Sequence, residues 1–434
     1  MTYLPSLIRY PPVSKFLYFL TYSAFGIDHI FPRIMQLIFY LLCAVYLYRT
    51  INLFYEKETA LLGASIYLFL PVVFAYAYLG ELASGTIFFI VVISFYFIRF
   101  IKDSDNRDLL LVAYLIGIGF LYKKPILLMF IICFIFLIAH KIKKHNMHSL
   151  IHLKILSLSL VPIIPWMILS KYFSWRNYSL QLSNFTSLDS KIVTYFSLLS
   201  SNLSVIIFIL FVLSIFYVCL FKRNTLTLFF GFLFIVYYFF VVSDMGWLSP
   251  RFSMLFYPTI TVFLSLFISR IIQIIKWKHA FKLCFIILTT YLIIISSVSP
   301  LNDRFLTIMN KKLEYYPSEK AMEWVKDNVK EGEKILTIRI MSANFYRVKY
   351  AIDRNRIDNF WYELKELSTP AGLKAYCKKN NVSYVMFPYS PAYPNSRNSA
   401  ILKYLKDNRG GEFMKVAEFN IDDNSILIYK TNEI

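Results

Sequence analysis

One acidic side chain stands out from the long apolar runs of this chain of 434 residues. Glu81 follows Leu79 and Gly80 at the end of one apolar run and precedes the next run. Ionisable groups at such positions are costly in a membrane and often functional. A carboxylate here is suited to accept a proton from a hydroxyl group or to bind a divalent metal ion. The alternative is a structural role, in which Glu81 stabilises the N-terminus of the following helix.

Basic side chains are placed where one cleft could bind a phosphate or pyrophosphate. The candidates are Arg9, Lys15, Arg33, Lys123, Lys124 and Arg251. Lysine meets phosphate oxygens as a point charge and arginine as a two-pronged donor. The Lys123-Lys124 pair is the strongest signal, because two cations there oppose the charge bias of the chain's loops. Each cation has an alternative role in reaching lipid headgroups, and Arg251 has another as the ion-pair partner of Asp244.

The elements that must position these residues are apolar helices. Of all residues 58% are hydrophobic and only 17% are charged, whereas a soluble domain carries about 25% charge. A membrane-spanning helix needs about 20 mainly apolar residues. The apolar runs therefore predict a polytopic α-helical membrane protein with about ten spans, at 30–48, 60–79, 84–101, 108–122, 125–140, 151–170, 202–221, 225–242, 253–271 and 280–298. Lys123, Lys124 and Pro125 mark either a turn between two short spans or a kink.

The orientation of these spans follows from their basic loops. One set of alternating loops contains 15 Lys and Arg residues and the opposite set contains six. Positive loops face the cytoplasm, so the N-terminus and the tail after residue 299 are expected outside. The net charge of +20 is explained by this bias, and we expect no nucleic acid partner. The composition favours an inner or single plasma membrane.

Three further segments have distinct characters. Residues 14–26 predict a short amphipathic helix along the outer surface, and residues 171–200 predict a polar outer loop. Residues 300–434 have the composition of a soluble α/β domain outside the membrane, whereas 1–299 form the membrane domain. The domain's expected elements are helices at 319–329 (capped by Ser318), 371–379 and 398–407 and strands at 334–340, 383–388, 413–420 and 425–430.

The order of several short motifs resembles the GT-C class of membrane glycosyltransferases, which includes protein O-mannosyltransferases and the lipid A aminoarabinose transferase. The matching motifs are Tyr10-Pro11-Pro12-Val13, Phe25-Gly26, Pro32-Arg33, the Ala-rich segment from Ala60 to Pro71, Gly119-Phe120-Leu121-Tyr122-Lys123, and Arg251-Phe252 with Tyr257-Pro258. The resemblance covers nearly the whole chain, and the order of the motifs carries it.

The resemblance implies an inverting enzyme that transfers a sugar from a polyprenyl-phosphate donor to a lipid, glycan or protein acceptor. The six cations named above then bind the donor phosphate, Glu81 is a candidate catalytic acid, and Tyr10 and Asp244 line the substrate groove. No metal ligands and no certain cofactor are assigned, and a divalent metal remains possible.

The sequence departs from the class at its beginning. The class carries its principal catalytic Asp in a loop before the Pro-Pro motif, and residues 1–10 contain no acid. We expect an N-terminally shortened chain or a misplaced start; a degenerate, non-catalytic member is the second interpretation. A transporter or flippase of lipid-linked saccharides is the alternative from another functional class.

Overall fold

The computed structural model of this chain describes residues 11–26, 30–70, 73, 77, 82–144, 149–174, 199, 203, 205–244, 253–275, 287, 311–338, 357–360, 369–389, 404–405, 412–421 and 424–431. Internal contacts divide the chain into two compact units, Met1–Leu306 and Thr307–Ile434. The division expected from composition, between residues 299 and 300, lies slightly earlier in the chain.

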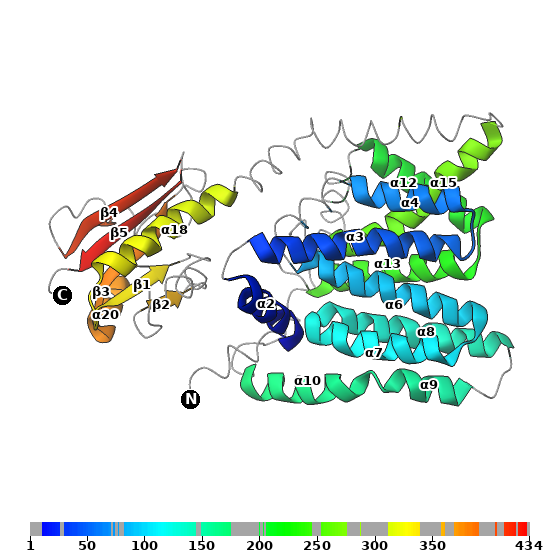
Figure 1. Cartoon of the computed structure of the whole chain (residues 1–434), viewed down its shortest axis with the longest axis horizontal. Coiled ribbons are helices and arrows are strands. Elements are labelled where there is room, and N and C mark those ends of the chain that lie inside the picture. The colour runs from blue at the N-terminus through cyan, green and yellow to red at the C-terminus, as the bar shows by residue number, and fades with distance from the viewer. Residues whose placement is uncertain are drawn as a thin grey trace. The chain divides into compact units, whose positions relative to one another are not determined.

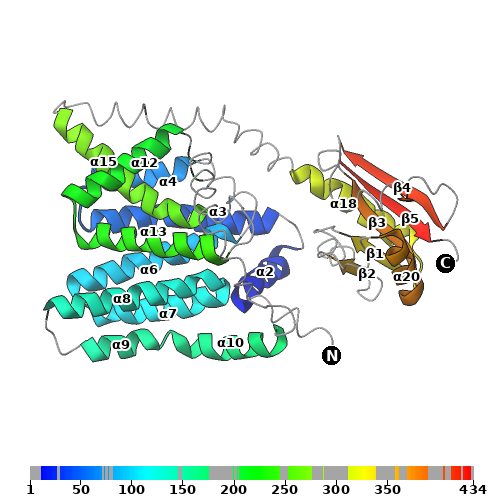
Figure 2. The same cartoon turned by 180° about the vertical axis from the view of Figure 1, so that it is seen from behind.

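The described part of the first unit is helical (Figures 1 and 2). Its elements are α2 (Pro12–Phe25), α3 (Ile30–Asn52), α4 (Lys57–Phe69), α6 (Ala83–Asp103), α7 (Asn106–Tyr122), the 3-10 turn η1 (Lys124–Ile126), α8 (Leu127–Lys144), α9 (Ser149–Ser157), α10 (Leu160–Ser174), α12 (Val205–Phe221), α13 (Thr225–Asp244), the 3-10 turn η3 (Met254–Phe256) and α15 (Tyr257–Ile275).

Apolar composition makes these helices suited to a membrane. Within the described residues four helical segments, Ile30–Asn52, Ala83–Asp103, Ile151–Leu169 and Met254–Ile274, are long and apolar enough to cross it, and three more are apolar but shorter. Inside α6, 83% of the apolar window is buried, against 17% for Ile151–Leu169. Hence α6 lies in the middle of the bundle, and α9 and α10 present most of their surface to lipid. The count of ten spans remains a prediction.

Two expected helices are interrupted, in both cases near proline. The helix expected over 60–79 breaks after Phe69, because Leu70, which precedes Pro71, is extended at ψ 114° and the ring of a proline disfavours helical geometry in the residue before it. The helix expected over 151–170 is divided into α9 and α10. Pro162 has no N–H to continue the ladder there.

The basic loops lie at one end of the bundle, as the antiparallel course of the helices requires. Lys102 Nζ, at the end of α6, donates to Leu53 O, just beyond α3, at 2.8 Å. Asn224 Nδ2, ahead of α13, donates to Tyr55 Oη at 2.7 Å. We call this the basic end; the opposite end holds the start of α6 and the end of α7.

The second unit contains a five-stranded sheet with strand order β2-β1-β3-β5-β4. Its elements are α18 (Lys311–Asn328), β1 (Lys334–Ile338), β2 (Ile357–Phe360), α20 (Pro370–Asn380), β3 (Val382–Tyr389), β4 (Phe413–Ile421) and β5 (Asn424–Thr431). Strand β1 is parallel to β2 and β3, whereas β5 is antiparallel to β3 and β4.

Alternating side chains give this sheet two apolar faces. Met386 and Ile428 pack with Val325 of α18, while Phe387 and Leu427 pack with residues of α20. Successive residues of a strand point to opposite faces, so α18 covers one face of the sheet and α20 the other, and the described part of the second unit has three layers, helix, sheet and helix.

The second unit also corrects two expectations. Helix α18 begins at Lys311, so Ser318 lies inside it and is not its N-cap. Strand β2 at Ile357–Phe360 was not expected, because this short segment carries only two large apolar side chains. Of the helix expected at 398–407 only 404–405 are described, and they are helical. The expected outer loop 171–200 and the span 280–298 lie mostly outside the described residues.

Candidate functional site

The helix ends that carry four of the expected phosphate-binding cations meet at the end of the bundle opposite the basic end. Lys15 lies on α2, Arg33 in the first turn of α3, and Lys123 and Lys124 at the junction of α7 and η1. Helix α2 packs against α3 and α7, and η1 contacts α6, α7 and α8. Both views show α2 beside the beginning of α3 (Figures 1 and 2). We call this region the candidate donor end.

A buried set of polar groups joins three of these helices. Gln36 of α3 is fully buried. Its Nε2 donates to Tyr122 Oη of α7 at 2.9 Å, and its Oε1 accepts from the backbone N–H of Gly85 at 3.0 Å. Gly85 lies in the first turn of α6, where the helix has no internal acceptor for its N–H groups. One side chain thus satisfies a helix N-terminus and fixes the end of α7.

The contact between α6 and α7 leaves no space for a side chain at residue 85. A Cβ atom there would lie 2.2 Å from Tyr122 Oη and 2.5 Å from Tyr122 Cζ. The Tyr122 ring is itself fully buried, so it has no room to move away. The close approach of α6 and α7 therefore depends on the absence of a side chain at residue 85, as small residues generally permit close packing of membrane helices.

The Lys123-Lys124 pair occupies a turn between two helices, which settles the choice between a turn and a kink. Helix α7 ends at Tyr122, and Lys123 is extended at φ −156° and ψ 131°. Pro125 is the second residue of η1, and its carbonyl accepts a hydrogen bond from Tyr237 Oη of α13 at 3.2 Å. Lys123 is half-buried and Lys124 is exposed. The turn thus presents two adjacent ammonium groups at the candidate donor end.

Lys15 is partly enclosed by its surroundings. It lies on α2, one residue after the buried Ser14, whose hydroxyl donates to Pro11 O at 3.3 Å. Partial burial lowers the pKa of Lys15 from its ordinary value, because a charged ammonium loses hydration there. An anion bound beside it would offset that loss. Gly26 follows the last residue of α2, and its φ of +86° is a conformation that glycine adopts without strain.

The remaining expected site residues lie outside what the structure describes. These are Arg9, Tyr10, Glu81, Arg251 and the side chain of Asp244, which is the last residue of α13. The N-cap of α6 is Leu82. The roles expected for these residues stay predictions.

Sequence reasoning missed three polar residues at the candidate donor end. Gln36 and Tyr122 form the buried contact described above, and the hydroxyl of Ser84 is buried without a hydrogen-bond partner in the described part of the chain. Gln36 could have been found, because an uncharged amide in the middle of an apolar span usually bonds to another helix. Tyr122 and Ser84 carry no such signal.

A cavity and the distribution of possible metal ligands both bear on where a site lies. A cavity of about 440 Å³ lies at the basic end, lined by residues of α3, α4, α12 and α15 and the loops that follow α3 and α12. No three His, Cys, Asp or Glu side chains gather as metal ligands within the described ranges. The binding of a divalent metal ion, considered from the sequence, remains a prediction.

Comparison with known proteins connects this arrangement to a class. The family described as dolichyl-phosphate-mannose-protein mannosyltransferase matches residues 9–169, the segment from the Pro-Pro motif to α10. No curated protein matches the sequence.

Two solved structures match nearly the whole chain. The apo structure of ArnT from Cupriavidus metallidurans has a TM-score of 0.56 and 11% sequence identity, covering 97% of this chain and 88% of that one. The apo oligosaccharyltransferase of Archaeoglobus fulgidus has a TM-score of 0.59 and 10% identity, covering 92% of this chain and 62% of its own length. The chain therefore has the fold of the GT-C class of membrane glycosyltransferases.

Proposed function

We propose that this protein transfers a sugar from a polyprenyl-phosphate donor to an acceptor at the outer face of the plasma membrane, with inversion at the sugar carbon. The observation that carries the proposal is the gathering of cation-bearing helix ends in a GT-C fold: Lys15, Arg33, Lys123 and Lys124 come from segments far apart in the sequence and lie at one end of the bundle. That end is the less basic one, which the positive-inside rule assigns to the outside.

The chemistry of the transfer gives each group a role. As the bond from the sugar carbon to the phosphate oxygen breaks, negative charge develops on the leaving phosphate, and cations already in place stabilise it. The Lys123-Lys124 turn supplies two such charges on a backbone fixed by Pro125 and Tyr237. Glu81 is the proposed base that takes the proton from the acceptor hydroxyl. The second unit is proposed to lie outside and to contribute to acceptor binding.

The experiment uses membranes that contain the full-length chain and a radiolabelled polyprenyl-phosphate sugar. Label appearing in an acceptor fraction, whether lipid, glycan or protein, supports a transferase. Label that crosses the membrane while still attached to the polyprenyl lipid supports the transporter alternative, and no movement of label in either assay contradicts both.

Matched variants locate the site. The double variant Lys123→Gln/Lys124→Gln is expected to lower kcat/KM by about 100-fold, because each substitution removes a positive charge that stabilises the negative charge developing on the leaving phosphate. The control Lys57→Gln/Arg107→Gln removes two exposed cations of the basic end and is expected to retain full activity. Glu81→Gln with unchanged activity would remove Glu81 from the mechanism while leaving the cation site intact.

A further inference from the structure

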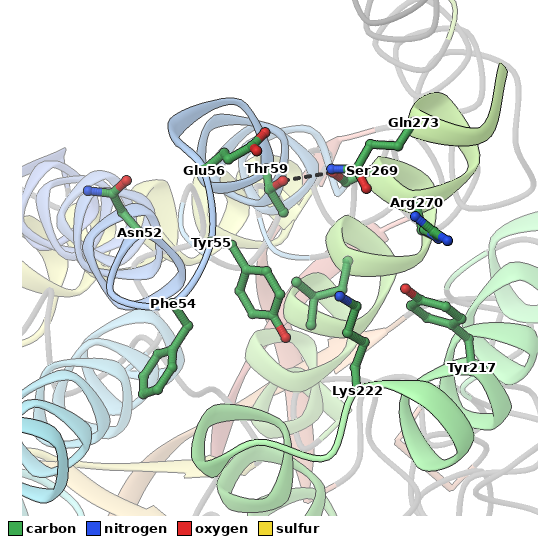
Figure 3. Close-up of a pocket in the computed structure, with 11 residues that line it drawn as sticks. Asn52, Phe54, Tyr55, Glu56, Thr59, Tyr217, Lys222, Ser269, Arg270 and Gln273 are labelled. Atoms are coloured by element: carbon green, nitrogen blue, oxygen red, sulfur yellow. Dashed lines mark hydrogen bonds between the residues drawn. The ribbon is translucent and has the colours of Figure 1, made fainter. Parts of the chain in front are cut away.

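The cavity at the basic end is lined by polar side chains from four helices and two loops. The residues around its 440 Å³ are Asn52, Phe54, Tyr55, Glu56, Thr59, Tyr217, Lys222, Leu266, Ser269, Arg270 and Gln273. A contact between Thr59 Oγ1 and Ser269 Oγ at 2.7 Å joins α4 to α15 at its edge (Figure 3). The cavity is thus built from segments more than 200 residues apart and is large enough for a small polar ligand.

Two cations dominate its charge. Lys222 and Arg270 form no ion pair within the described part of the chain. The Lys222 ammonium lies 5.9 Å from the centre of the Tyr55 ring, and in the view of Figure 3 it projects between Tyr55 and Tyr217. The lining contains one carboxylate, Glu56, which is exposed. The lining therefore carries a net positive charge and several hydrogen-bond donors, which favours an anion with oxygen acceptors.

An apolar surface lies on one of the helices that line this polar cavity. On α12, which carries Tyr217, the side chains exposed at helical spacing are Ile206, Ile209, Leu213, Phe216 and Leu220, and their exposed fractions range from 47% to 65%. Residues three and four apart lie on one face of a helix, so these five form a continuous apolar stripe along α12, whose last member, Leu220, precedes Lys222 by two positions in the chain. A ligand with a phosphate and long hydrocarbon chains would match both surfaces at once.

We propose that this cavity binds the phosphate of an anionic phospholipid from the bilayer leaflet at the basic end, with its acyl chains along the α12 stripe. Basic pockets between membrane helices bind anionic headgroups by this combination of charge and apolar contact. The bound phosphate joins the segments that carry Tyr55, Lys222 and Arg270, and so closes the basic end of the bundle. This site is separate from the candidate donor end and does not depend on the proposed transferase activity.

The test measures lipid binding and thermal unfolding of the full-length protein in a neutral detergent. Three probes are compared: phosphatidylglycerol, diacylglycerol with the same acyl chains, and inorganic phosphate. We expect phosphatidylglycerol to remain bound in native mass spectrometry and to raise the unfolding temperature, and the other two probes to do neither. Equal effects of diacylglycerol, or full protection by inorganic phosphate alone, would overturn the proposal.

Charge variants assign the binding to the cavity. Lys222→Gln/Arg270→Gln is expected to weaken phosphatidylglycerol binding by about 30-fold, because two basic residues each contribute about fivefold. The control Arg223→Gln removes the neighbouring exposed cation, whose Nε donates to Cys219 O and which does not line the cavity. We expect it to bind as the unaltered protein does; equal binding by the double variant and the control contradicts the site.

The unfolding temperature of the protein without lipid distinguishes a structural role of the two cations from a role in lipid binding. If they act through the ligand, the double variant and the unaltered protein unfold at the same temperature when no phosphatidylglycerol is present. Should the double variant fail to fold, the single variant Lys222→Gln and the salt dependence of the unaltered protein decide the question. Binding that persists undiminished in about 1 M salt, where exposed charges are screened, would overturn the proposal.

Discussion

The two ends of the helix bundle satisfy their polar groups in opposite ways. At the candidate donor end, Gln36, Tyr122 and Gly85 are bonded to one another and enclosed, and the cations lie around them. At the basic end, polar side chains line a cavity that also includes the exposed Lys222 and Arg270. A membrane helix end must satisfy its backbone groups either within the protein or with lipid headgroups and water. The first end is fixed from within, whereas the second leaves room for a ligand.

The largest effect is expected from breaking the enclosed end with Gly85→Ala. The added Cβ would meet three atoms of the buried Tyr122 side chain at 2.8 Å or less, and overpacking of this kind costs about 3 kcal/mol at the upper end of its range. Thermal unfolding in detergent measures the change.

Gly231→Ala in α13 is the control for that variant. Its nearest atom would be Phe263 Cζ at 3.6 Å, an ordinary contact, and alanine favours the helix by about 1 kcal/mol. Equal destabilisation by the two variants would show that the Tyr122 contact is not what sets the distance between α6 and α7.

At the basic end, Asp108→Ala removes the partner of Arg99. Arg99 Nε donates to Asp108 Oδ2 at 2.5 Å, and its Nη2 donates to Oδ1. Asp108 is buried and Arg99 partly exposed, so we expect a loss of about 2 kcal/mol, typical of hydrogen bonds to a charged group. The control Asp103→Asn changes an exposed carboxylate on the same corner and should alter the unfolding temperature little.

Asn224 offers a smaller and more selective change. Its Oδ1 accepts from Thr227 N at 3.0 Å, capping α13, while its Nδ2 donates to Tyr55 Oη. Asn224→Ala is expected to cost about 1 kcal/mol through the lost cap. Asn224→Asp keeps the cap and loses only the donor to Tyr55, so its unfolding temperature should lie between those of the alanine variant and the unaltered protein.

The smallest effect is the pH dependence that arises from Lys15. Its pKa is lower in the folded protein than in the unfolded chain, so this residue's contribution to stability grows as pH rises through the folded-state pKa and is complete above the unfolded-state pKa. Donor binding should follow the opposite course, because only the ammonium form attracts phosphate. Lys15→Arg, which stays charged, should flatten the alkaline limb of a KM-against-pH profile; an unchanged limb would remove Lys15 from the donor site.

Helix positions could be read from the sequence wherever composition alone decides them. The apolar runs at 30–48, 84–101, 225–242 and 253–271 coincide with α3, α6, α13 and α15. The short apolar runs within 383–388 and 425–430 coincide with β3 and β5. The exceptions are local: Leu70 and Pro162 interrupt helices whose hydropathy is continuous, because proline changes backbone geometry without changing polarity.

The sequence by itself determined that this chain is a membrane protein, because the period and length of its apolar runs are local properties that only a bilayer accommodates. It also determined that the basic loops share one end, since antiparallel helices reverse direction at each loop. Only the tertiary structure decided that Gln36 meets Gly85 and Tyr122, and that Tyr55, Lys222 and Arg270 surround one cavity. These contacts join residues far apart in the chain, and which helix face meets which neighbour depends on side-chain packing that no local pattern encodes.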